Sequence, residues 1–164
     1  MDQAARSRDG QVLDLARYVP GLLTFMANKL STSASAVYQR RFGINITTWR
    51  VLSQVAIEPG VTASRICQVI GLDKGPVSRT LARMEDDGFV VSSPDPDDAR
   101  RRHVSITREG RALHDRVLAV ALAREARLLS CLDPAEREAL IGLLNQLHAH
   151  LPAVTEAPHR GEPA

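Results

Sequence analysis

The chain has 164 residues, of which 44% are hydrophobic and 24% are charged, and its formal net charge is +2. This length and composition are typical of one compact globular domain with room for a satellite element, and they exclude an intrinsically disordered chain. Aromatic residues are scarce at 4%, which favours a helical fold with an aliphatic core, and a pI near 8.8 permits nucleic acid as a partner without requiring it.

The N-terminal part of the chain predicts a tail and one long helix. Residues 1–11 are polar and expected to be disordered. In residues 12–43, apolar side chains recur at steps of three and four residues, which is typical of an amphipathic helix. Pro20 suits its first turn and Gly43 its end. The apolar positions are Leu23, Met26, Leu30, Ala34 and Val37.

The next segment, residues 44–107, begins with three short helices. The second and third of these are separated by a tight glycine turn, so residues 62–86 predict a helix-turn-helix. The first of the three is expected to start at Thr47 or Thr48 and to end at Pro59-Gly60. The second is expected to run from Thr62 to Gly71, and the third from Asp73 to Gly88.

After Gly88 the hydrophobic period changes from that of a helix to that of a strand. Phe89–Val91 form a β-prone run, and Val104 and Ile106 alternate with polar residues. Between them lies the stretch "SSPDPDDARRRHVSIT", which has three acids followed by three arginines. Two strands directly after a helix-turn-helix predict a winged helix, a mainly α fold with a small β-wing.

Residues 108–151 predict two further helices, and residues 152–164 a disordered tail. Thr107 suits the start of the first helix, and "DPAE" at 133–136 is a capping box for the second. The apolar stripes of these helices and of the helix in residues 12–43 need a covering surface. We expect a second copy of the chain, in a homodimer; an intramolecular cap on the winged helix is the alternative.

The fourth helix, from about Asp73 to Gly88, predicts a DNA-recognition face. Small residues surround one arginine on this face, which would let the helix approach a groove floor. Arg79 is suited to base readout, and Lys74 and Arg83 to phosphates. The acids at 85–87 oppose this interpretation, and an exposed helix with a stray arginine is the alternative. The inward positions are Val77, Thr80, Leu81 and Met84; the outward ones are Gly75, Ser78, Arg79 and Ala82.

The predicted wing carries Arg100, Arg101 and Arg102 next to acidic residues. An arginine at a wing tip can enter the minor groove, and a fixed pose improves its binding because less conformational entropy is lost. Asp97 or Asp98 can supply that pose through a charge-assisted hydrogen bond. We interpret the acids as positioning the arginines; a solvated charged turn is the alternative.

The segments "TTWRVLSQV" (47–55), "GLDKGPVSRTLARMEDDGFV" (71–90) and "DPDDARRRHVSITREG" (95–110) resemble the MarR family of bacterial transcription regulators. The resemblance implies a homodimer that binds a near-palindromic operator on double-stranded DNA, usually to repress. The family's Asp-x-Arg wing motif matches Asp98-Ala99-Arg100. Two departures are serines at 92 and 93, where relatives often have a basic residue, and Gly75-Pro76 in place of small hydroxyl residues. The expected DNA contacts are Lys74, Gly75, Pro76, Ser78, Arg79, Arg83, Asp98, Arg100, Arg101 and Arg102.

The resemblance also implies a small phenolic or aromatic effector, for which Tyr38, Trp49 and His114 are candidate ligands, although core packing is the preferred interpretation of all three. Cys67 is interpreted as a packed residue, whereas Cys131 is open to either a structural or a redox role.

No cofactor, metal or membrane span is predicted. The chain has no CxxC motif, and His148 and His150 point apart on a helix. No apolar run approaches the roughly 18 residues of a membrane span and no signal peptide is visible, so we expect a cytoplasmic, nucleoid-associated protein. A DNA-organising protein with little sequence preference is the alternative function. An enzyme is not expected, because no nucleophile–base pair, phosphate-binding loop or carboxylate dyad has plausible spacing.

Overall fold

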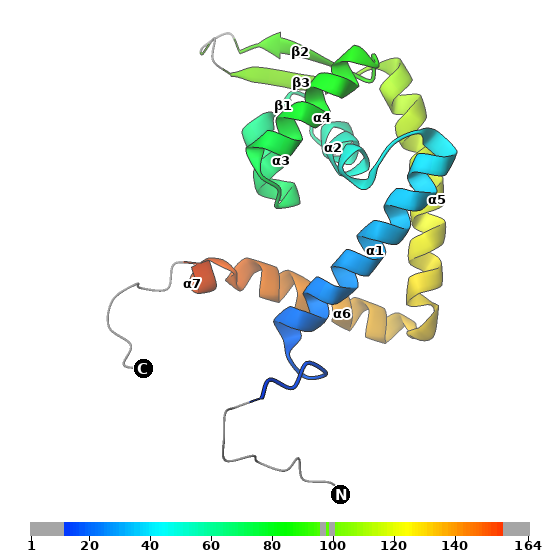
Figure 1. Ribbon diagram of the computed structural model, residues 1–164, viewed down its shortest axis with the longest axis vertical. Helices are drawn as coiled ribbons and strands as arrows, with labels where there is room; N and C mark the ends of the chain where they lie inside the picture. Colours follow the sequence, from blue (N-terminus) through cyan, green and yellow to red (C-terminus); the bar gives the residue numbers. More distant parts are fainter. Residues whose placement is uncertain (1–11, 96–97, 99–100, 156–164) are drawn as a thin grey trace, which may run out of the picture. The chain divides into compact units, whose positions relative to one another are not determined.

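The structure is a computed structural model that describes residues 12–95, 98 and 101–155. It divides into two compact units, Met1–Val117 and Leu118–Ala164. The described part of the chain is mainly helical with a small antiparallel sheet, so the predicted fold class is confirmed. The elements of the first unit (Figure 1) are α1 (Val19–Phe42), α2 (Ile46–Ile57), β1 (Val61–Thr62), α3 (Ala63–Ile70), α4 (Lys74–Asp86), β2 (Val90–Pro94), β3 (Arg102–Ile106) and the first turns of α5 (Arg108–Leu128).

Short-range capping sets most of the helix ends in the first unit. α1 ends at Gly43, whose left-handed backbone (φ 72°) suits glycine, and Thr62 accepts a hydrogen bond from the Arg65 amide at the start of α3. The prediction of Thr47 or Thr48 as the cap of α2 is wrong. Asn45 caps this helix, since its side chain accepts a 2.9 Å hydrogen bond from the amide of Thr48.

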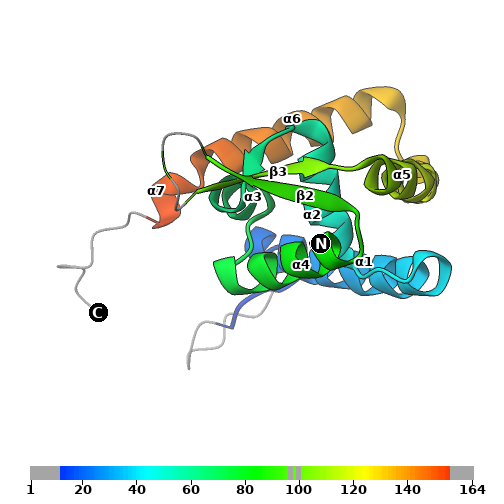
Figure 2. The same cartoon turned by 90° about the horizontal axis from the view of Figure 1, so that it is seen from above.

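A three-stranded antiparallel sheet has the order β1–β3–β2. The hairpin of β2 and β3 was predicted, but β1, which pairs Val61 with Val104, was not. Figures 1 and 2 show β2 and β3 side by side, with β3 leading into the start of α5. The apolar core of the unit is aliphatic, and its most deeply buried side chains are Val51, Leu52, Val55, Ile66, Val77, Met84, Leu113 and Val117.

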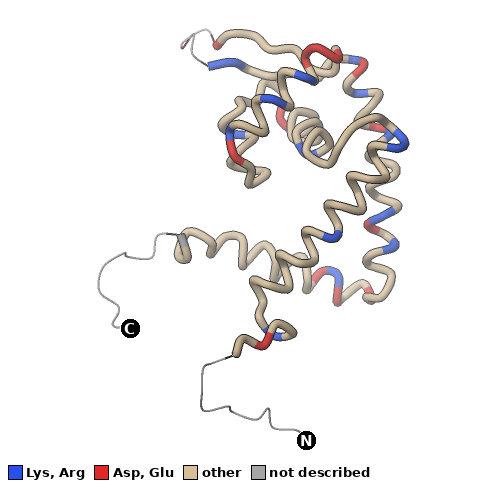
Figure 3. The backbone as a smooth tube through the Cα atoms, viewed as in Figure 1, with Lys and Arg blue, Asp and Glu red and all other residues tan. Residues whose placement is uncertain are grey.

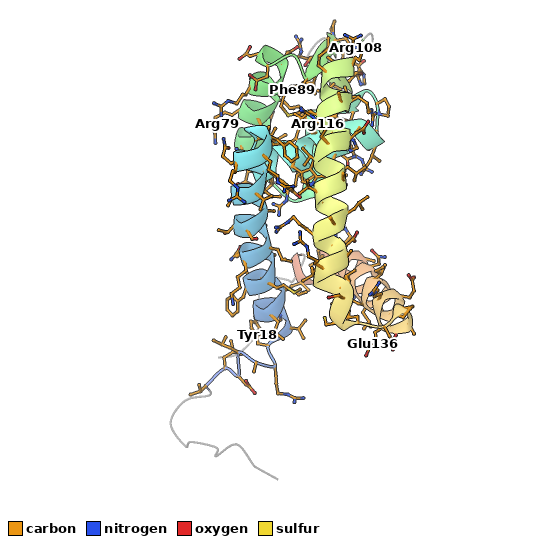
Figure 4. The ribbon with its side chains drawn as sticks, turned by 90° about the vertical axis from the view of Figure 1, so that its right-hand side faces the viewer. Tyr18, Arg79, Phe89, Arg108, Arg116 and Glu136 are labelled. Atoms are coloured by element: carbon orange, nitrogen blue, oxygen red, sulfur yellow. The ribbon has the colours of Figure 1, made fainter. Side chains whose placement is uncertain are left out.

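The start of α5 is joined tightly to the chain between α4 and β2. Thr107 donates a hydrogen bond from its hydroxyl to the Gly88 carbonyl (2.7 Å), and the same hydroxyl accepts from the Gly110 amide (3.0 Å), as a helix cap does. Gly110 lies against Phe89, where a side chain would overlap the carbonyl of that residue. Phe89 lies beside the first turns of α5 in Figure 4.

The second unit contains the remainder of α5, a 3₁₀ turn η1 (Leu129–Cys131), α6 (Pro134–His150) and α7 (Pro152–Thr155). The predicted capping box of α6 is present: Asp133 accepts from the Glu136 amide, and the Glu136 carboxylate accepts from the Asp133 amide, both at 2.9 Å. Residues 152–155, predicted as disordered, form the short helix α7. The predicted tails at 1–11 and 156–164 lie outside the described residues.

Exposed apolar side chains recur along α6, at Ile141, Leu143, Leu144 and Leu147. None of its residues is buried, and its Arg and Glu residues lie in the first turns, up to Glu138 (Figure 3). Leu143 and Leu147 are 58% and 47% exposed. Among the described residues, no helix is long and apolar enough to cross a membrane.

Candidate nucleic-acid interface

The predicted recognition face lies on α4 as the helical period requires. Val77, Leu81 and Met84 are buried, Thr80 is half-buried, and the opposite side is exposed. The side chain of Arg79 projects outward from α4 in Figure 4. The predicted contacts on the exposed side are Lys74, Gly75, Pro76, Ser78, Arg79 and Arg83.

Gly75 has a specific effect on Arg79, one turn further along α4. A Cβ atom at position 75 would lie 3.4 Å from Nη1 of Arg79, so the missing side chain leaves room for the guanidinium along the helix surface. The departure from the family pattern at this position therefore changes the space that is available to the main candidate for base readout.

The wing turn is held by a compact set of hydrogen bonds. The amide of Asp98 donates to Oδ1 of Asp95 (3.2 Å), the amide of Asp95 donates to the Arg101 carbonyl (3.0 Å), and the amide of Arg101 donates to the Asp98 carbonyl (2.8 Å). Asp98 also pairs with Arg101, with 3.4 Å between Oδ2 and Nε. Arg100, the arginine of the predicted Asp-x-Arg motif, and Asp97 lie outside the described residues.

Glu85, which the sequence presented as an obstacle to DNA binding, connects α4 to the wing. Its Oε1 accepts a 3.0 Å hydrogen bond from the Ser92 amide and lies 3.8 Å from Nη2 of Arg102. The same Nη2 donates to the Ser92 carbonyl at 3.1 Å. This acid therefore fixes the wing strands on the end of the recognition helix, and its charge is partly balanced by Arg102. Sequence spacing gave no indication of it, because the partners lie in different elements.

A groove of about 650 Å³ runs between α3, α4 and the wing. Among the described residues, four cationic side chains line it, and Glu85 is the one acidic residue in its lining. A groove with this charge and with walls from a helix and a hairpin suits a polyanion. The cationic residues are Arg65, Lys74, Arg101 and Arg102.

A smaller recess of about 330 Å³ lies where the start of α2 meets α4. It is lined by Asn45 and Thr47 together with Arg79 and Arg83. The free amide groups at a helix N-terminus favour anions, so this recess adds a candidate phosphate contact. The sequence interpretation missed it because Thr47 was considered only as a cap.

His103 in β3 occupies the base of the wing. Its Nδ1 lies 2.6 Å from the carbonyl oxygen of Gly60, and its Nε2 lies 2.9 Å from Oδ2 of Asp95. The hydrogen bond with the Gly60 carbonyl, followed by that with Asp95, raises the pKa of His103 above its ordinary value of 6.5, whereas the charge of Arg101 opposes this rise.

The three candidate effector ligands pack against one another. Trp49 stacks on His114 with ring centroids 5.4 Å apart, and Tyr38 meets Trp49 edge-on at 6.0 Å. Tyr38 and His114 are buried, at 3% and 8% exposure. The arrangement fits the interpretation of these residues as core packing.

The cysteines differ in exposure. Cys67 is half-buried on α3, and Cys131 is exposed in η1. Within the described ranges, no group of three or more histidine, cysteine or acidic side chains could hold a metal ion.

The helices α3 and α4, followed by the paired strands β2 and β3, place the chain in the class of winged helix-turn-helix proteins. The sequence model of the MarR family matches residues 42–101 of the chain. An HTH-type transcriptional regulator from Bacillus cereus is 26% identical over 121 residues, which cover 73% of this chain and 80% of that protein.

Solved structures agree with this class. A MarR/EmrR family regulator from Acinetobacter sp. ADP1 is 28% identical, with a TM-score of 0.80 over 86% of this chain and 99% of that one. The Staphylococcus aureus MepR–DNA complex shares the fold, with a TM-score of 0.69 at 20% identity over 79% of this chain and 95% of that one. The MarR family of transcription regulators, which the sequence motifs predicted, is thus the family of the matching sequence model and of these structural neighbours.

Proposed function

We propose that this MarR family regulator represses transcription by binding a near-palindromic operator as a homodimer. The observation that carries the proposal is the groove between α4 and the wing, in which the cations of both elements face the same space. The fold it shares with a protein solved on DNA supports the same conclusion.

In this proposal α4 enters the major groove. Arg79 contacts a base edge, because its guanidinium is exposed and has room along Gly75. Lys74 and Arg83 bind phosphates on either side, and the recess at Thr47 adds a further backbone contact. Gly75, Pro76 and Ser78 are the further proposed contacts, at positions where α4 approaches the DNA closely.

The wing is proposed to contact the minor groove next to each half-site. Arg100 is the candidate for insertion, Asp98 and Arg101 form an ion pair, and Arg102 stays on the Glu85 side of the groove. Fixing the hairpin on α4 through Glu85 gives the two contacts a defined spacing.

The proposed roles of the segments follow the boundaries predicted from the sequence. Residues 44–107 bind DNA, and residues 12–43 and 108–151 form the dimer. The apolar surface of α6 supports this assignment, since a soluble single chain rarely exposes such a stripe. Release of the operator by a small aromatic effector, with Tyr38, Trp49 and His114 as the candidate contacts, stays a prediction from the family resemblance.

Selection of genomic fragments by the purified protein, followed by titration of the recovered fragment, tests the proposal. A regulator should bind the recovered fragment about a thousandfold or more tightly than random duplex at physiological salt. A ratio near one would instead establish the alternative, a DNA-organising protein with little sequence preference. Reporter expression from a promoter that contains the fragment distinguishes repression from activation.

A further inference from the structure

Both ring nitrogens of His103 face hydrogen-bond acceptors that belong to different parts of the chain. Nδ1 contacts the carbonyl of Gly60, in the loop before β1, and Nε2 contacts the carboxylate of Asp95, at the end of β2. The side chain of Asp95 is only 15% exposed and that of His103 35%. The imidazole therefore bridges the wing turn and the body of the winged helix.

Only one protonation state of His103 satisfies this geometry. A neutral imidazole has one N–H, so one of its nitrogens would direct a lone pair at an acceptor oxygen, whereas the imidazolium donates from both nitrogens. Each partner is an acceptor whichever tautomer is chosen. The bridge is complete only when His103 carries its second proton.

Asp95 transmits this bridge to the wing turn. Its second oxygen, Oδ1, accepts from the amide of Asp98, and its own amide donates to the carbonyl of Arg101. The carboxylate of Asp95 thus holds both His103 and the amide of Asp98, and the backbone of Asp95 holds Arg101, the ion-pair partner of Asp98.

Gly60 provides a firm anchor on the other side. Its amide donates to the carbonyl of Val104 at 3.1 Å, so both of its backbone groups are bound to β3. Loss of the His103 bond removes one of these two contacts and loosens the wing from the loop that follows α2.

We propose that protonated His103 is a positioning residue that fastens the wing hairpin to the winged helix, so that wing-dependent DNA affinity decreases when the imidazole loses its proton. This inference rests on the proposed function, in that the wing must contact the operator. The wing would then bind more weakly in alkaline conditions without any effector.

The direction of the pH dependence follows from the raised pKa of His103. The contribution of the bridge is fully present below the ordinary value of 6.5 and is lost as the pH rises through the raised folded-state pKa. Asp95 favours the charged form and Arg101 opposes it.

The other neighbours of His103 do not change this direction. Its cross-strand partners, Thr62 on β1 and Ser93 on β2, do not titrate in this range. On the adjoining helices, Glu58 after α2 and Arg65 on α3 form an ion pair with each other.

The Asp95→Asn variant distinguishes the bridge from a simple charge effect. The asparagine oxygen can still accept from the Asp98 amide, while its NH₂ can donate to Nε2 of neutral His103, whose Nδ1–H donates to Gly60. The variant bridge is therefore complete in the neutral state and broken in the charged one. We expect its affinity to rise with pH, opposite to the wild type.

The first measurement is an NMR titration of His103 in the full-length protein without DNA, assigned with His103→Gln. We expect a pKa above 6.5 in the wild type and a lower pKa in Asp95→Asn. A wild-type pKa of 6.5 or below would overturn the bridge, whether or not the protein recognises an operator.

The second measurement is the affinity for the selected genomic fragment from about pH 6 to about pH 8.5 at fixed salt. We expect the wild type to lose about tenfold as the pH rises, Asp95→Asn to gain, and His103→Gln to be flat. The Arg79→Ala variant should bind more weakly at every pH, but the ratio of its affinities at low and high pH should equal that of the wild type.

The alternative is that the imidazolium only adds a positive charge near DNA. Asp95→Asn would then bind more tightly at all pH values and retain the wild-type slope, which would refute the positioning role. If the wild type selects no fragment at any pH, the proposed function fails, and the NMR titration still decides whether the bridge exists.

Discussion

The winged helix and α6 expose opposite kinds of surface. In the winged helix, Val51, Leu52 and Val55 have no exposed area, and the exposed side of α4 carries charged and small residues. In α6 no residue is buried, and Leu143 is 58% exposed. One region thus has a complete core within the chain, whereas the other presents the apolar side chains that a core would contain.

This contrast indicates where each region obtains its stability. A side chain that is already buried contributes to folding of the single chain, while an exposed leucine contributes only when another surface covers it. Substitutions in the winged helix should therefore act on folding or on DNA contacts. Substitutions on α6 should act on assembly.

The largest effect is expected for Leu144→Glu on α6. Leu144 is 39% exposed in one chain, so the change should cost little in the monomer, but it would bury a charge in the proposed dimer at a cost of several kcal/mol. Analytical ultracentrifugation should show dissociation, and binding of the selected fragment should be lost. Ile57, the last residue of α2, is 75% exposed, so Ile57→Glu is the matched control and should leave sedimentation unchanged. A wild-type protein that is a stable monomer at micromolar concentration would remove the basis of the comparison.

Gly110→Ala should give the next largest effect, on stability. The new methyl group would overlap the Phe89 backbone, which cannot rotate away as a side chain can, so we expect a loss of about 1–3 kcal/mol or more in urea unfolding. Gly142→Ala on α6 is the control, since no atom lies within 4 Å of the added carbon. It should raise the helix propensity of α6 by about 0.5–1 kcal/mol. Equal effects of the two substitutions would contradict the close approach at Gly110.

Arg79→Ala tests the polar surface of the winged helix. Operator binding should weaken by roughly 1–3 kcal/mol, with relaxed preference at one base pair in each half-site. Arg116→Ala removes the same charge from the exposed side of α5 (Figure 4) and should change affinity only slightly. A uniform loss over all sequences in Arg79→Ala would assign this residue to phosphate contact instead.

Cys67→Ala should cost on the order of 1 kcal/mol, because Cys67 is half-buried on α3, next to the buried Ile66. The exposed Cys131 makes Cys131→Ala a near-neutral control in the same unfolding assay. Operator release by peroxide that disappears in Cys67→Ala would show that the packing interpretation is wrong.

The smallest effect is expected for Asp98→Asn, but the sign of its change in DNA affinity distinguishes the two interpretations of the wing acids. Its ion pair with Arg101 is exposed, so its contribution to stability is below about 1 kcal/mol. If the acid positions the wing arginines, fragment binding should weaken although the protein becomes more positive. Tighter binding at fixed salt would mean that the wing acids are only a solvated turn.

Short-range patterns were sufficient for much of this architecture. The helical period placed Val77, Leu81 and Met84 inside α4, and the spacing of Asp133 and Glu136 located the start of α6. These features depend on residues three or four positions apart, so the sequence alone contains the necessary information.

The remaining features depend on contacts between distant residues. Asn45 competes with Thr47 and Thr48 for the cap of α2, and only the path of the chain after α1 decides between them. The bond from His103 to Gly60 spans 43 positions, and no local pattern predicts it. For the same reason, the contacts of Glu85 with Ser92 and Arg102 had no local signal in the sequence.

The Thr107 hydroxyl, which bonds both Gly88 and Gly110, has a consequence for how this regulator can diversify. It closes the chain from 88 to 107 at its base, so the wing is a loop inserted between two fixed ends. Its turn can be lengthened, shortened or recharged without a change in the helices on either side. Under the proposed function, exchanging the wing turn alone would therefore change the contacts with the flanking DNA and leave the base contacts of α4 as they are.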